Sequence, residues 1–117
     1  MSGEFSMLDL FRTEAETQAA TLNEGLLALE NGASAEVLES LMRAAHSMKG
    51  AARMVDVEPA VRVAHAMEDA FVAAQKGELV LEAAHIDELL RATDLLSGIA
   101  EHAGDAAWLE QQAAAID

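Results

Sequence analysis

Four stretches of this chain carry apolar side chains at steps of three and four residues, the spacing that places them on one face of an α-helix. These stretches are residues 7–30, 34–54, 58–76 and about 86–103. Each is long enough for five or six helical turns and is amphipathic, so each must bury its apolar face against a neighbour. The pattern favours helices packed on helices and leaves no segment that reads as a β-sheet.

Turn and capping residues separate the stretches. Ser34 can cap the second helix, Pro59 suits the first turn of the third, and Gly77 ends the third. Connections of a few residues between helices of about twenty force antiparallel neighbours. We therefore predict an all-α fold: an antiparallel up-and-down four-helix bundle at about 5–103, with an additional C-terminal helix at about 105–116, in a single domain spanning 1–117.

The composition narrows the possible partners. Seven Lys and Arg residues stand against 21 Asp and Glu residues, and the formal charge of −14 repels a nucleic-acid backbone. No apolar run approaches the roughly 18 residues that a membrane span needs, and the first residues lack the pattern of a signal peptide. The chain has no cysteines, which excludes disulfides and thiolate metal sites. We expect a cytoplasmic protein with no nucleic-acid partner and no membrane contact.

A set of chemistry-bearing side chains falls at the predicted edge of the bundle. His46, Lys49 and Gly50 lie on one side of the second helix, and His65 and Glu68 stand one turn apart on the third. If these two helices pack antiparallel, both rows meet across the bundle surface. A glycine inside a helix lowers helix stability by about 1 kcal/mol relative to alanine. The presence of Gly50 therefore indicates a role for the missing side chain, such as close approach by another group.

The run His46-Ser47-Met48-Lys49-Gly50, joined to His65-Ala66-Met67-Glu68, resembles the histidine phosphotransfer (HPt) domain. The resemblance is closest to the amino-terminal domain of CheA-type chemotaxis histidine kinases and covers roughly residues 5–103. One turn position departs from the family pattern, because Asp56 stands where the family commonly has glycine. Aspartate tolerates turn and left-handed conformations, so we expect the turn to survive, and the departure bears on how a partner packs against that loop.

The resemblance implies a role for each member of the set. His46 would accept a phosphoryl group on Nε2, because a neutral imidazole has one nitrogen lone pair free to attack phosphorus. Glu68 would accept the Nδ1 hydrogen and orient the ring, with His65 in the same polar network. Lys49 would supply positive charge to the phosphoryl oxygens, and Gly50 would leave room for them.

No cofactor is expected in this domain, because the sequence has neither a Gly-rich phosphate loop nor a carboxylate cluster suited to Mg²⁺ beside ATP. The resemblance implies two partners: the ATP-binding domain of a histidine kinase, which phosphorylates His46, and a response-regulator receiver domain, whose aspartate takes the group. ATP and Mg²⁺ would come from these partner domains. The domain alone would be a phosphoryl carrier, and we expect it to be a fragment of a larger histidine kinase.

Two other interpretations stay open at the level of sequence. His46, His65 and Glu68 are acceptable zinc ligands, although the positive charge of Lys49 opposes a metal ion. Alternatively, the bundle is a helical protein-interaction module that binds a partner without chemistry. His85 and His102 belong to no such set and are expected at the surface.

Overall fold

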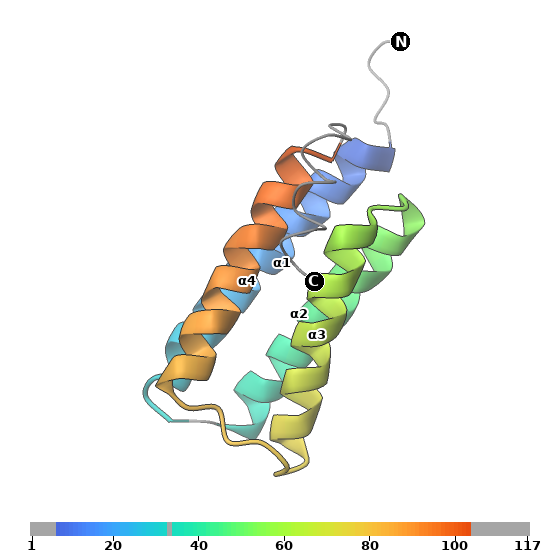
Figure 1. Cartoon of the computed structure of the whole chain (residues 1–117). Helices are drawn as coiled ribbons and strands as arrows, with labels where there is room; N and C mark the ends of the chain where they lie inside the picture. Colours follow the sequence, from blue (N-terminus) through green and yellow to red (C-terminus); the bar gives the residue numbers. More distant parts are fainter. Residues whose placement is uncertain (1–6, 33, 104–117) are drawn as a thin grey trace.

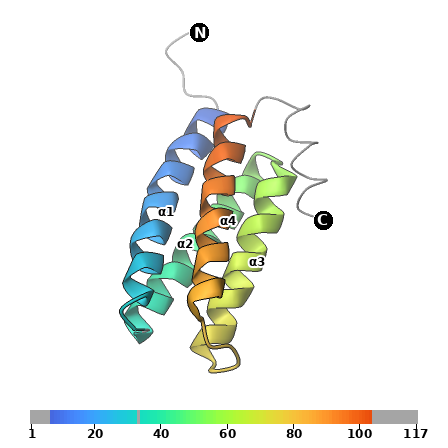
Figure 2. The same ribbon diagram turned by 60° about the vertical axis from the view of Figure 1, so that its left-hand side comes forward.

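The computed structural model describes residues 7–32 and 34–103, and within them the chain forms four long helices. They are α1 (Met7–Leu29), α2 (Ala35–Met54), α3 (Glu58–Gln75) and α4 (Ala83–Glu101). The helices run alternately up and down (Figure 1). Figure 2 shows the second side of the bundle, in which α4 lies against α1 and α3 while α2 takes the opposite corner. The predicted all-α four-helix bundle is confirmed, and the additional helix at 105–116 lies outside the described residues.

Local residue chemistry sets the helix ends as the sequence predicts. The Oγ atom of Ser34 accepts a hydrogen bond of 3.1 Å from the backbone N–H of Val37, which caps α2. Pro59 stands in the first turn of α3. Asp56, in the turn between α2 and α3, has a φ of 57°. This is the left-handed conformation that aspartate tolerates, so the turn forms without a glycine.

The core runs the length of the bundle between the four apolar faces. Its one buried polar side chain among the described residues, Thr93, donates a hydrogen bond of 2.9 Å to the carbonyl oxygen of Leu89 and is therefore satisfied. None of the described helices is both long and apolar enough to cross a membrane. The largest fully buried apolar side chains are Phe71, Leu22, Leu26, Leu41, Met48, Met67, Leu96 and Ile99.

Two helical glycines face opposite environments. A Cβ atom added to Gly25 on α1 would lie 2.6 Å from Cδ2 of Leu41, so this glycine lets α1 and α2 approach closely. A Cβ atom added to Gly50 on α2 would meet no atom within 4 Å. The packing of this chain therefore explains the first glycine and gives no reason for the second.

Candidate functional site

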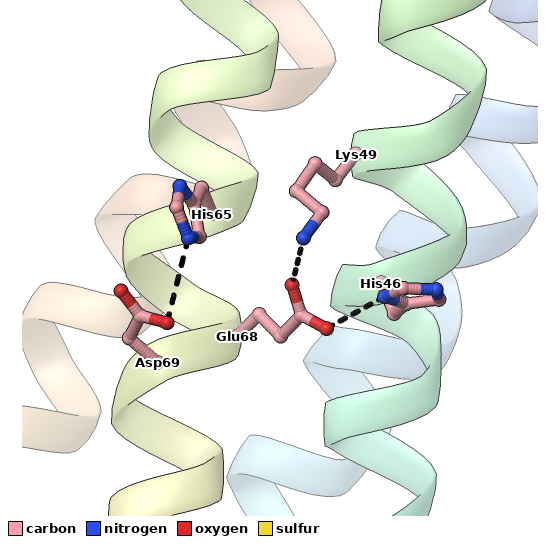
Figure 3. A network of polar contacts seen from close by, with 5 residues as sticks. All are labelled: His46, Lys49, His65, Glu68 and Asp69. Carbon is pink, nitrogen blue, oxygen red and sulfur yellow. Dashed lines mark hydrogen bonds and ion pairs between the residues drawn. The ribbon is translucent and has the colours of Figure 1, made fainter.

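The short turn between α2 and α3 makes them antiparallel neighbours, and this brings His46 and Glu68 together. Oε2 of Glu68 lies 2.6 Å from Nδ1 of His46 (Figure 3). The second carboxylate oxygen, Oε1, accepts a hydrogen bond of 2.5 Å from Nζ of Lys49. Glu68 thus bridges two side chains of α2 that stand one turn apart, and three of the predicted site residues form one hydrogen-bonded group.

The members of this group differ in their access to solvent. The side chains of Lys49 and Glu68 are each 13% exposed, so their ion pair lies in the seam between α2 and α3. The side chain of His46 is 65% exposed. Its ring therefore stands at the bundle surface, with one nitrogen held by the protein and the other open to a partner.

The carboxylate of Glu68 is ionised at neutral pH. Partial burial acts to raise the pKa of Glu68, but the hydrogen bonds from Lys49 and His46 and the attraction of their charges outweigh it, so the pKa lies below its ordinary value. An ionised carboxylate can only accept hydrogen bonds, so Nδ1 of His46 must carry the hydrogen. In the neutral ring the free lone pair is then on the exposed Nε2.

Two shallow hollows flank the ring of His46. The hollow on the α1 side is lined by Met7, Leu10, Phe11, Glu14, His46, Ser47, Gly50, Ala51, Met54 and Val55. The hollow on the α3 side is lined by Glu39, Met42, Arg43, His46, Ser47 and Glu68. Most residues that line the first hollow are apolar, whereas most that line the second are polar or charged. Gly50 lies in the first hollow, where its missing side chain widens the space beside the imidazole.

His65 is the one predicted site residue that the structure places elsewhere. Its Nε2 atom lies 3.6 Å from Oδ1 of Asp69, one turn along α3, and its side chain is 52% exposed (Figure 3). The structure shows no hydrogen bond between His65 and Glu68, because the His65 ring is turned toward Asp69. The expectation that His65 shares the network was wrong in geometry: spacing along one helix did not reveal which way each side chain turns.

Sequence reasoning also missed an adjacent polar link across the same seam. Oε2 of Glu39 accepts a hydrogen bond of 2.7 Å from Nε of Arg43, and Oε1 accepts one of 3.0 Å from Nε2 of Gln75 on α3. The spacing of four residues between Glu39 and Arg43 could have indicated the first contact. The second joins two helices, and nothing in the local sequence marks it.

A metal site finds no support in the described residues. Within residues 7–32 and 34–103, no three His, Cys, Asp or Glu side chains lie close enough together to hold a metal ion. His65, the third ligand of the zinc interpretation, is turned toward Asp69. The positive charge of Lys49 occupies the place beside Glu68 that a metal ion would need.

Comparison with known proteins identifies relatives of this bundle. A family model described as Hpt domain matches residues 6–114. The gliding motility regulatory protein of Myxococcus xanthus is 35% identical over 96 residues, which make up 82% of this chain and 12% of that protein. Chemotaxis protein CheA of Treponema pallidum is 28% identical over 101 residues, or 86% of this chain and 12% of that protein. The chain thus spans about an eighth of the length of these relatives.

A solved structure shares the fold. It is the phosphorylated P1 domain of CheA3 in complex with CheY6 from R. sphaeroides, and it superposes with a TM-score of 0.75 at 23% sequence identity. The match covers 94% of each chain. At this identity the likeness concerns the helical fold, which agrees with the bundle described above.

Proposed function

This chain belongs to the Hpt domain family, and from that premise we propose that His46 is a phosphoryl carrier in two-component signalling. The ring takes a phosphoryl group from the ATP-binding domain of a histidine kinase and passes it to an aspartate of a response-regulator receiver domain. The contact of 2.6 Å between Glu68 and Nδ1 of His46 is the observation that carries the proposal. It supports a ring whose exposed Nε2 atom has the free lone pair.

The residues divide the chemistry between them. The lone pair of Nε2 forms a bond to the γ-phosphorus of ATP while the bond from that phosphorus to the bridging oxygen breaks, and ADP leaves with the electron pair. Glu68 keeps the hydrogen on Nδ1 and stabilises the positive charge that the ring gains. In the return step an aspartate oxygen of the receiver attacks phosphorus, the N–P bond breaks, and Nε2 regains its lone pair.

Lys49 and Gly50 have supporting roles in this proposal. Lys49 offsets the negative charge of Glu68 through their ion pair, so the carboxylate that orients the ring repels an approaching phosphoryl group less. Gly50 lies in the same hollow as the imidazole and leaves the space that a phosphoryl group and its donor need. His65 has no part in this chemistry, because it contacts Asp69 instead.

In this proposal the partner domains provide ATP and Mg²⁺. ATP would be bound by the kinase domain, and the receiver would bring the Mg²⁺ that assists transfer to its aspartate. The shared fold with a P1 domain captured with CheY6 supports a receiver as one partner. We place the domain in the cytoplasm, where ATP is available, as one part of a larger histidine kinase.

Phosphorylation of two matched histidine variants tests the proposal. The domain is incubated with Mg²⁺, radiolabelled ATP and the kinase domain of a CheA-type protein, and the label is followed through acid and alkali. We expect an acid-labile, alkali-stable label that is lost in His46→Gln and kept in His65→Gln, whose replaced ring is also exposed. An isolated receiver domain should then remove the label.

The same experiment distinguishes the other interpretations. A wild-type domain that stays unlabelled while binding the kinase or the receiver would indicate an interaction module without chemistry. Label that persists in His46→Gln would assign the phosphoryl group to another residue. Either result would overturn the proposal.

A further inference from the structure

We infer that Arg43 is a further phosphoryl-binding residue, held by Glu39 in the resting domain and exchanging that partner for the phosphoryl group once His46 carries one. The inference rests on the proposed function, because it concerns the phosphorylated form of His46. It adds to that function a second cation, Arg43, and a residue, Glu39, that binds this cation before phosphorylation.

The cation expected at this site is already engaged. Nζ of Lys49 donates to Oε1 of Glu68, and the lysine side chain is only 13% exposed. Nδ1 of His46 faces the other oxygen of the same carboxylate. Nε2 lies across the ring from Nδ1, so a phosphoryl group on it would stand on the far side of the ring from Glu68 and Lys49 (Figure 3). A second cation on the open side would complete the site.

Arg43 is placed to be that cation. It precedes His46 by three residues on α2, a spacing that puts two side chains on the same side of a helix. Side chains of a helix lean toward its N-terminus, so the ring of His46 leans over the turn that contains Arg43. Both residues line the hollow on the α3 side. The arginine side chain is 74% exposed and therefore has room to move.

The present partner of Arg43 holds it weakly. Its Nε atom lies 2.7 Å from Oε2 of Glu39, one turn earlier on the same helix, and exposed pairs of this kind add little stability. A phosphoryl group offers three oxygens and up to two negative charges, and the planar guanidinium binds such a group through two parallel hydrogen bonds. Phosphorylation therefore provides the stronger partner.

Glu39 does not lose all of its contacts when Arg43 leaves. Its Oε1 atom still accepts the hydrogen bond of 3.0 Å from Nε2 of Gln75 across the seam. Hydrogen bonds from Arg43 and Gln75 and the charge of Arg43 hold the pKa of Glu39 below its ordinary value, so the carboxylate is ionised at neutral pH. Glu39 thus competes for the guanidinium until a more highly charged anion appears.

The hollow on the α1 side also favours Arg43 as the phosphoryl-binding cation. On the α1 side the ring of His46 meets a mainly apolar surface whose charged member is Glu14. Glu14 accepts a hydrogen bond of 3.0 Å from Nε2 of Gln18, and no Lys or Arg lines this hollow. The α1 side therefore offers space beside Gly50 but no Lys or Arg, and Arg43 supplies the cation from the α3 side.

The test uses the phosphorylated domain directly. Wild type and variants are phosphorylated with potassium phosphoramidate, and the pKa of the phosphoryl group is read from its ³¹P chemical shift against pH. A neighbouring guanidinium favours the dianion, so Arg43→Ala should raise this pKa and Glu39→Gln, which removes the competitor, should lower it. Arg91→Ala is the control: it removes an equal charge from an exposed position on α4, which does not adjoin α2.

A kinetic measurement accompanies the titration. With the kinase domain and ATP, we expect kcat/KM for phosphorylation to fall about twofold to fivefold in Arg43→Ala, the size expected for an exposed charge contact. Arg43→Lys should recover part of the loss, because lysine restores the positive charge but not the two parallel hydrogen bonds of the guanidinium. A lysine variant as impaired as the alanine variant would overturn the assigned charge contact.

Titration curves of Arg43→Ala and Arg91→Ala that superimpose would overturn the inference. If Arg43→Ala fails to fold, Glu39→Gln still decides, because an unchanged phosphoryl pKa in that variant contradicts partner exchange. Failure of the proposed function looks different: with the kinase domain and ATP, the wild type would acquire no phosphoryl label that His46→Gln removes.

Discussion

Oε2 of Glu68 lies 2.6 Å from Nδ1 of His46, although 22 residues separate the two along the chain. The other oxygen of the same carboxylate binds Lys49, so one side chain orients the imidazole and anchors a neighbouring cation. The pair fixes which ring nitrogen carries the hydrogen. The remaining nitrogen, Nε2, faces solvent with its lone pair free, and this is the arrangement that a phosphoryl acceptor needs.

Replacing Glu68 by alanine should slow phosphorylation of His46 by about tenfold or more, because the ring loses the acceptor that selects its tautomer. The fold should persist, since Glu68 lies at the seam and not in the apolar core. Nitrogen-15 NMR of the imidazole gives the tautomer, and labelled ATP with the kinase domain gives the rate. His65→Ala is the matched control and should keep the wild-type rate. An unchanged rate in Glu68→Ala would remove its orienting role.

Replacing Lys49 by methionine should destabilise the domain by about 1–3 kcal/mol, because Glu68 keeps its charge but loses a hydrogen-bond donor in a seam where it is 13% exposed. The double variant Lys49→Met with Glu68→Gln should cost less than the sum of the two single changes. Urea unfolding of all four proteins measures this coupling. Strictly additive free energies of unfolding would mean that the ion pair contributes no stability.

Gly50→Ala should stabilise the isolated domain by about 0.5–1 kcal/mol, because the helix gains a better helix former and the added methyl group meets no atom. The same methyl group stands in the hollow beside His46, so phosphoryl transfer should become slower. Urea unfolding and the rate of transfer to a receiver measure the two effects.

Gly25→Ala provides the contrast to this variant. Its methyl group would meet Leu41 at 2.6 Å, and overpacking of this kind costs about 1–3 kcal/mol.

A more stable Gly50→Ala variant that transfers at the wild-type rate would show that Gly50 is not needed for space at the site.

The Glu68 contacts also predict a pH dependence of stability. Because the pKa of Glu68 in the folded domain is below its ordinary value of 4.5, the unfolded chain binds this proton more readily. Stability from these contacts is complete above the unfolded pKa and is lost as the pH falls through the folded pKa. The stability gap between wild type and Glu68→Gln should therefore shrink as the pH falls from about 5 to 3, a range below that in which imidazoles ordinarily titrate. A gap that stays constant would contradict the assigned ionisation.

Much of this molecule follows from local sequence. The apolar spacing of three and four residues predicts four helices, and all four are present with their buried faces inward. Ser34 caps α2 and Asp56 takes the left-handed turn, because capping and turn preferences depend on a few adjacent atoms. The histidine with its following lysine and glycine likewise marks the candidate acceptor from the sequence alone.

Only the packed structure decides which side chains meet. It gives Glu68 both His46 and Lys49, directs His65 to Asp69, and joins Glu39 to Gln75 across two helices. The physical reason is that helical periodicity fixes the face on which a residue lies, but not the rotation of one helix against another or the rotamer of each side chain. The sequence by itself therefore determined the bundle and the candidate acceptor, and tertiary packing decided the hydrogen bonds that orient its ring.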